Sequence, residues 1–320
     1  MEVTEELFGV SNKAVPEMET LAPYKETGGV FYSVGTSIYN WRNSSQNSSF
    51  LIEYNADITR LHHVIPNKLI VCSESSVSLY VFENDILNLV RHLVCDQQKE
   101  VQLTNSNCSR TSFAKLGPTA IDYSMPDILY YADGSTVCQV NMFNASHANL
   151  ATNITLDESL GDVTAMTISD GLFTIQKSNF THTVSSYDLV SSKPPRTASF
   201  SIESHDTILQ AVHLGNGALL CHNKGMKLVL LNTFTGHVSP VSTGTTHLPC
   251  GSSGCGQTPI QLNYLSSYSN TEGQRAYLYG VDGSKKPITL HYNSKYTSQL
   301  VRSCCLSNWA HAMRKVVNKL

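Results

Sequence analysis

The residues of this sequence that could bind a metal ion gather in one short stretch, HLPCGSSGCGQ, over residues 247–257. It holds His247, Cys250 and Cys255, and imidazole and thiolate are ligands that zinc prefers. A structural zinc site usually pairs two closely spaced ligands with a second pair from another segment, and no such pair is evident in the sequence. The stretch is therefore predicted to be a flexible glycine-rich loop rather than a metal site.

The same glycines could in principle cradle a phosphate, which requires a strand before them and a helix after them. The residues that follow, QTPIQLNYL, contain Pro259 and are typical of a strand. No nucleophile elbow, HExxH motif or convincing pair of acids occurs elsewhere. We therefore predict no catalytic residue, no cofactor-binding residue, no metal ligand and no cofactor.

Histidines and cysteines elsewhere have simple structural interpretations. His62, His63 and His222 lie on or beside expected strands, where a structural hydrogen bond is commoner than a role as a base. Cys304 and Cys305 are adjacent, and adjacent cysteines rarely bond each other. Nine cysteines, an odd number, without an export signal favour free thiols and an intracellular location, in the nucleus, at the nuclear envelope or in the cytoplasm.

The composition narrows the class of protein. The chain has 320 residues, of which 41% are hydrophobic and 15% charged, and its net charge is −3. A protein that binds nucleic acid directly usually has a basic excess, so nucleic acid is not expected as a partner. No apolar run approaches the roughly 18 residues of a membrane span. The abundance of Ser, Thr and Asn favours strands and turns over helices.

The elements expected to position the histidines and cysteines named above are strands. The clearest of these strands lie between Asp162 and Glu203. Four strand-like stretches occur there, separated by the turns SDG, KSNF and VSSKPPR. Four strands in about 42 residues have the size of one β-propeller blade. The pattern recurs, with first strands expected at the positions Ile58, Ala120, Val163, Ile208 and Ile260.

Two of the intervals between these positions, 43 and 45 residues, match the repeat of four-stranded blades. The stretch GGVFYSVGTSIYNW is expected to begin a first blade. A strand from the N-terminus could complete the ring and remove its exposed edges. A pair of β-sandwiches has similar turn spacing and is the competing architecture.

The repeats resemble those of the WD40 family, whose third strands end in Trp-Asp. VSSYDL has Tyr187 and Asp188 at these positions, and LVLLNTFTG has Leu231 and Asn232. The Gly-His dipeptide of the family is missing at blade starts. The blade order also resembles that of small WD-repeat nucleoporins of the Y-shaped nuclear-pore scaffold.

The fold is thus predicted to be an all-β, WD40-like β-propeller of six to seven four-stranded blades with a short C-terminal amphipathic helix. Residues 1–27 form an N-terminal extension that could supply a closing strand. Residues 28–302 form the propeller, with a polar insert at 83–117, and residues 303–320 form the helix. One face of that helix carries Leu306, Trp309, Ala310, Met313, Val316, Val317 and Leu320.

The resemblance implies a non-catalytic scaffold that binds other proteins of a multi-subunit assembly. One alternative is a propeller-type hydrolase similar to diphthine methylesterase, which would need a cluster of His, Asp or Glu at a channel mouth. Another is a secreted, glycosylated propeller, because six Asn-x-Ser/Thr sequons begin at Asn43, Asn47, Asn107, Asn144, Asn153 and Asn179.

Overall fold

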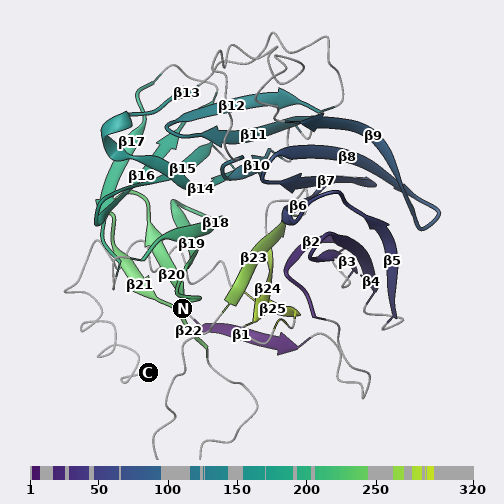
Figure 1. Cartoon of the computed structure of the whole chain (residues 1–320). Helices are drawn as coiled ribbons and strands as arrows, with labels where there is room; N and C mark the ends of the chain where they lie inside the picture. The colour runs from purple at the N-terminus through teal and green to yellow at the C-terminus, as the bar shows by residue number, and fades with distance from the viewer. Residues whose placement is uncertain are drawn as a thin grey trace, which may run out of the picture.

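The computed structural model is a ring of β-sheets arranged around a central axis (Figure 1). It describes residues 2–7, 17–25, 29–42, 47–64, 66–94, 116–122, 125, 127–142, 154–169, 171–189, 193–202, 206–243, 262–269, 276–282, 285 and 287–291. These residues form five four-stranded sheets, one five-stranded sheet and one turn of 3-10 helix, η2 (Glu158–Leu160). The predicted all-β propeller is therefore confirmed, with six sheets.

Five blades follow one another along the chain, each an antiparallel meander whose first strand lies nearest the axis. Their strands are β2 (Thr20–Lys25), β3 (Gly29–Val34), β4 (Ser37–Arg42) and β5 (Asn47–Glu53) in blade 1; β6 (Ile58–Val64), β7 (Lys68–Ser73), β8 (Ser76–Glu83) and β9 (Ile86–Val94) in blade 2; β10 (Thr119–Ile121), β11 (Ile128–Asp133), β12 (Thr136–Asn141) and β13 (Ile154–Thr155) in blade 3; β14 (Asp162–Ile168), β15 (Leu172–Ser178), β16 (Thr181–Tyr187) and β17 (Arg196–Phe200) in blade 4; β18 (Ile208–Gly215), β19 (Ala218–Asn223), β20 (Leu228–Asn232) and β21 (Val238–Pro240) in blade 5.

The sixth blade joins the two ends of the described chain. Its strands β23 (Leu262–Ser269), β24 (Ala276–Asp282) and β25 (Pro287–His291) form a meander, and β1 (Glu2–Leu7) pairs antiparallel with β25. The short strand β22 (Ser242–Thr243) pairs in parallel with β1. A strand from the N-terminal segment thus covers the outer edge of the last meander.

The core is divided among the interfaces between blades. Six clusters of buried apolar residues each join two successive blades, and the last joins blade 6 to blade 1 through Tyr264 and Val281 against Leu21 and Trp41. The strand β2 contacts both β6 and β23. This continuous succession of interfaces is the radial order of a propeller and excludes a pair of sandwiches.

The turns follow from residue type. Asn232 ends β20, and its Oδ1 accepts hydrogen bonds from the backbone N–H groups of Phe234 at 2.9 Å and Thr235 at 3.1 Å. An asparagine thus shapes the turn at the position where WD40 repeats place aspartate. Gly217 lies in the β18–β19 turn with φ of 70°, a backbone conformation that favours glycine.

Several predicted boundaries and one chemical expectation need correction. Blade 1 begins at Thr20, inside the predicted extension 1–27, since Thr20–Lys25 forms β2, the first strand of that blade. The insert predicted at 83–117 is shorter, since Ile86–Val94 forms β9. Cys138 is disulfide-bonded, so the expectation of free thiols is wrong there, whereas Cys72 and Cys221 form no disulfide and are buried. The predicted helix at 303–320 lies outside the described residues.

Candidate functional site

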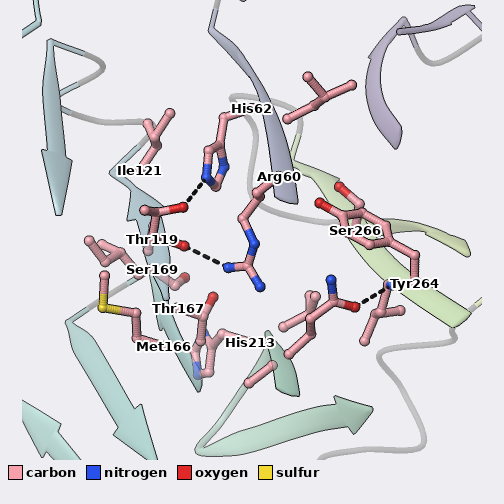
Figure 2. Close-up of a pocket in the computed structure, with 17 residues that line it drawn as sticks. Arg60, His62, Thr119, Ile121, Met166, Thr167, Ser169, His213, Tyr264 and Ser266 are labelled. Carbon is pink, nitrogen blue, oxygen red and sulfur yellow. Dashed lines mark hydrogen bonds between the residues drawn. The ribbon is translucent and has the colours of Figure 1, made fainter. Parts of the chain in front are cut away.

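The first candidate site is a cavity in the central channel, lined by the inner strands of blades 2 to 6. Its volume is about 90 Å³, enough for a few water molecules and well below the roughly 300 Å³ of typical small-molecule pockets. Figure 2 shows the side chains that line it, with the Arg60 guanidinium in their midst. The polar side chains belong to Arg60, His62, Thr119, Thr167, Ser169, Gln210, His213, Tyr264 and Ser266.

Thr119 connects the polar groups of blades 2 and 3. Its carbonyl oxygen accepts a hydrogen bond from Arg60 Nη1 at 2.7 Å, and its Oγ1 lies 2.8 Å from His62 Nε2. Arg60 and His62 are two positions apart on β6, so both side chains leave the strand on its channel side. The bond to the Thr119 carbonyl therefore fixes the direction of the Arg60 side chain, and the bond to the Thr119 hydroxyl fixes that of His62.

The charge of the cavity is unbalanced. Burial, together with the neighbouring positive charge of Arg60, lowers the pKa of His62 to about 3, so this imidazole is neutral at pH 7. Neither Asp nor Glu occurs among the residues that line the cavity. Within the described part of the chain, Arg60 forms no ion pair. Among the residues that the structure describes, the guanidinium therefore has no carboxylate partner.

The opposite wall of the cavity is held by aromatic and amide groups. Burial raises the pKa of Tyr264, against the opposing effect of the positive charge of Arg60. The Oε1 of Gln210 accepts a hydrogen bond from the backbone N–H of Leu265 at 2.6 Å and so links blades 5 and 6. The His213 ring stacks on Phe173, with 4.7 Å between ring centroids. These contacts give the wall a fixed shape.

The other histidines singled out in the sequence have structural surroundings. His222 Nε2 lies 2.5 Å from the carbonyl oxygen of Leu262, as expected for a structural histidine. His63 lies in an aromatic cluster, with ring centroids 6.0 Å from Tyr24 and 6.2 Å from Phe31. The candidate metal ligands His247, Cys250 and Cys255, and the pair Cys304–Cys305, lie outside the described residues.

The sequence analysis missed Arg60 and Thr119. Their contact joins residues 59 positions apart, and no local pattern marks it. Among the residues that the structure describes, no group of three or more His, Cys, Asp or Glu is arranged to hold a metal ion. The cavity holds His62 and His213 without an acid, so the cluster that a propeller hydrolase would need is not found in the described lining.

The second candidate site is the outer edge of blade 2, formed by β9 and called here the β9 edge. This strand has nine residues, and three of its apolar side chains are more than half exposed: Ile86, Leu89 and Val90. The outermost strands of blades 1, 3, 4 and 5, which are β5, β13, β17 and β21, have seven, two, five and three residues. Long, apolar edge strands are uncommon because they can pair with another chain.

A β-bulge aims part of this edge outward. Tyr80 of β8 pairs with Leu89 and Leu79 pairs with Arg91, so Val90 is the additional residue. The strand is tied to its neighbours on both sides. Arg91 Nη1 donates a hydrogen bond to the carbonyl oxygen of Asn141 in blade 3 at 2.8 Å, and Asp85 forms an ion pair with Arg42 of blade 1. These contacts join β9 to blade 3, and the turn before it to blade 1.

Comparisons with known proteins identify the fold and no family. No protein-family model and no curated protein matches this sequence. A chain of the solved structure "Crystal Structure of Mitotic Checkpoint Complex" is similar, with a TM-score of 0.54 and 13% identity, over 89% of this chain and 94% of that chain. A computationally designed protein, Ika8, gives a TM-score of 0.45 and 11% identity over 86% of this chain and 70% of the other.

At such low identity the first similarity is informative about the fold alone, and the second is too weak to support an argument. The propeller architecture is therefore supported independently of the WD40 resemblance, and membership of a particular family stays a prediction. No helix within the described residues is long and apolar enough to cross a membrane.

Proposed function

We propose that this chain is a non-catalytic scaffold that binds other proteins within a multi-subunit intracellular assembly. The β9 edge supports this proposal most directly, because within the described part of the chain the outer side of β9 pairs with no other strand, and exposed apolar side chains lie beside it. The partner that fits it is an extended, apolar segment of another protein that adds to blade 2 as a fifth strand.

The geometry favours such strand addition over a looser contact. Backbone N–H and C=O groups of an added strand would pair with the outer edge of β9, and alternate side chains would pack against Leu89 or Val90. Because β9 is paired with β8 along its whole length and Arg91 bonds it to blade 3, little ordering of β9 is needed on binding. Leu87 and Leu93, by contrast, are buried and serve the blade itself.

The sequence resemblance to WD-repeat nucleoporins makes the Y-shaped nuclear-pore scaffold the assembly that we propose for this chain. The test is affinity purification of the tagged chain from its native cell, with quantification of the proteins that co-purify. Wild type should recover stoichiometric subunits of one assembly, and the double variant Leu89→Lys, Val90→Lys should lose them.

Phe50→Lys is the matched control, since Phe50 is 57% exposed on the outer strand of blade 1, close to the 56% of Leu89. The Phe50→Lys variant should recover the same proteins as wild type. Isolation of the wild-type chain as a lone monomer would overturn the scaffold proposal. Recovery of a different stoichiometric assembly, lost in the same double variant, would support the scaffold role and reject the nuclear-pore assignment.

A further inference from the structure

We propose that the channel cavity is a binding site for one compact oxyanion, a carboxylate or phosphate group, that pairs with the guanidinium of Arg60. The site is separate from the β9 edge, so it stands or falls independently of the proposed function. The same chemistry can come from two sources: a free anion such as inorganic phosphate, or the carboxylate of an acidic residue of a protein that covers the channel mouth.

The first argument is charge. Arg60 is half-buried, and the residues that line its cavity include neither Asp nor Glu. A guanidinium carries five N–H donors. The carbonyl of Thr119 accepts one of them, and within the described residues no carboxylate takes another. A partly buried cation without a counter-charge is an unfavourable arrangement that a bound anion would relieve.

The second argument is the kind of donor around the cation. Thr167, Ser169 and Ser266 also line the cavity, and Figure 2 shows their side chains around the Arg60 guanidinium. Hydroxyl groups can donate to an oxyanion while Arg60 binds it through two parallel N–H groups. Thr167 lies on β14, Ser169 directly follows that strand, and Ser266 lies on β23, so the three hydroxyl groups come from blades 4 and 6. An anion between them would join blades 2, 4 and 6.

The third argument is size and preorganisation. A volume of about 90 Å³ admits a carboxylate or a phosphate group but not a nucleotide or a typical metabolite. Thr119 acts as a positioning residue, because its carbonyl orients Arg60 and its hydroxyl is already engaged by His62. The cation therefore points into the cavity before the anion arrives, which reduces the cost of ordering on binding.

The test measures the thermal stability of the full chain in increasing inorganic phosphate, against sodium chloride of equal ionic strength. A ligand that binds the folded state raises Tm with its concentration. Wild type should show this rise. Arg60→Gln should weaken phosphate binding about ten- to hundred-fold, the range expected for hydrogen bonds to a charged group. Equal responses of Arg60→Gln and wild type would overturn the proposal.

Arg91→Gln is the matched control, because Arg91 also donates to a carbonyl of the next blade, at 2.8 Å, but does not line the cavity. It should bind phosphate as wild type does. If Arg60→Gln does not fold, Ser169→Ala provides the same test and should weaken binding about three- to ten-fold. Unchanged binding in Ser169→Ala would then count against the site.

The two sources are distinguished with short blocked peptides. Acetyl-Gly-Glu-Gly-amide should raise the Tm of wild type, and its Gln counterpart should not, if the anion is carried by an acidic residue. A response to phosphate alone would assign the site to a free anion. If neither phosphate, acetate nor the Glu peptide raises Tm, the oxyanion site is rejected. This result would not affect the proposal for the β9 edge.

Discussion

Acid should destabilise this propeller between pH 7 and pH 5 through two neighbouring histidines, His62 and His63. Burial lowers the pKa of His63 to about 4, and burial with the charge of Arg60 lowers that of His62 to about 3. His63 is 4% exposed, and its Nδ1 has no hydrogen-bond partner among the described residues. Neither folded side chain can therefore readily accept the proton that an unfolded histidine binds with a pKa of about 6.5.

The sign of the effect follows from proton counting. Below pH 6.5 the unfolded chain binds these protons and the folded chain does not, so the free energy of unfolding falls as the pH falls. At pH 5 each histidine should lower this free energy by about 2 kcal/mol relative to pH 7, or about 4 kcal/mol for the pair. The fold lowers the pKa of the Glu19 and Glu53 carboxylates. Their contribution to the free energy of unfolding is lost only as they are protonated, at a pH below this window.

The assay is urea denaturation at pH 7, 6 and 5, with the midpoint and slope measured at each pH. His63→Leu should fold, because its site is apolar and aromatic, and should remove about 2 kcal/mol of the acid-induced loss. His182 and His222, whose pKa values burial also lowers, add to the loss that remains. His237→Gln is the control, since His237 is exposed in the turn before β21, and it should leave the loss unchanged. A stability independent of pH over this range, or an equal loss in His63→Leu and wild type, would refute the reasoning.

Three further predictions concern the ring and its thiols. Gly161 has φ of 82°, and an added Cβ would lie 2.0 Å from the carbonyl oxygen of Lys177, so Gly161→Ala should lower the urea-denaturation free energy by about 1–3 kcal/mol. Deleting residues 1–7 should lower Tm in a calorimetric scan, because β25 loses its antiparallel partner; an unchanged Tm would mean that β1 does not close the ring. Alkylation of the denatured chain without reductant, read by peptide mass spectrometry, should modify Cys221 but not Cys138; modification of Cys138 would show that it is a free thiol.

Much of the fold could be predicted because strands that are buried on their blade faces have a local signature. Expected first-strand positions at Ile58 and Ile208 begin β6 and β18, and Ala120 and Val163 lie within β10 and β14. In each case a run of apolar residues is bounded by turns rich in Gly, Asn or Asp. The spacing of the apolar residues and the residues of the turns both indicate a strand. The repeat length then predicts their arrangement around an axis.

Two strands were missed for physical reasons. The stretch TLAPYK of β2 contains Pro23, which normally argues against a strand inside a sheet. The β9 segment was assigned to a polar insert because polar residues follow it in the sequence, although ILNLVRHLV itself is largely apolar. The β-bulge at Val90 interrupts the simple alternation that marks a strand with one exposed face.

The candidate channel site could not be predicted because it exists only in the closed ring. Arg60 and Thr119 contribute to the same cavity from different blades, and Ser266 comes from the last blade. A lone arginine in a strand carries no local signal that it will face a cavity whose described lining holds no acid. The interpretation of His62 as a structural histidine is supported by its hydrogen bond to the Thr119 hydroxyl, and a separate bond to the Thr119 carbonyl orients Arg60.

Hydrogen–deuterium exchange of the β9 edge tests the scaffold account most directly. The recombinant chain is compared with the same chain purified from cells in its native assembly. If a partner adds a strand to blade 2, amides over residues 86–94 should exchange more slowly in the assembly, while those of the short outer strand β21 (Val238–Pro240) should not change. Equal exchange of residues 86–94 in both samples would contradict the account.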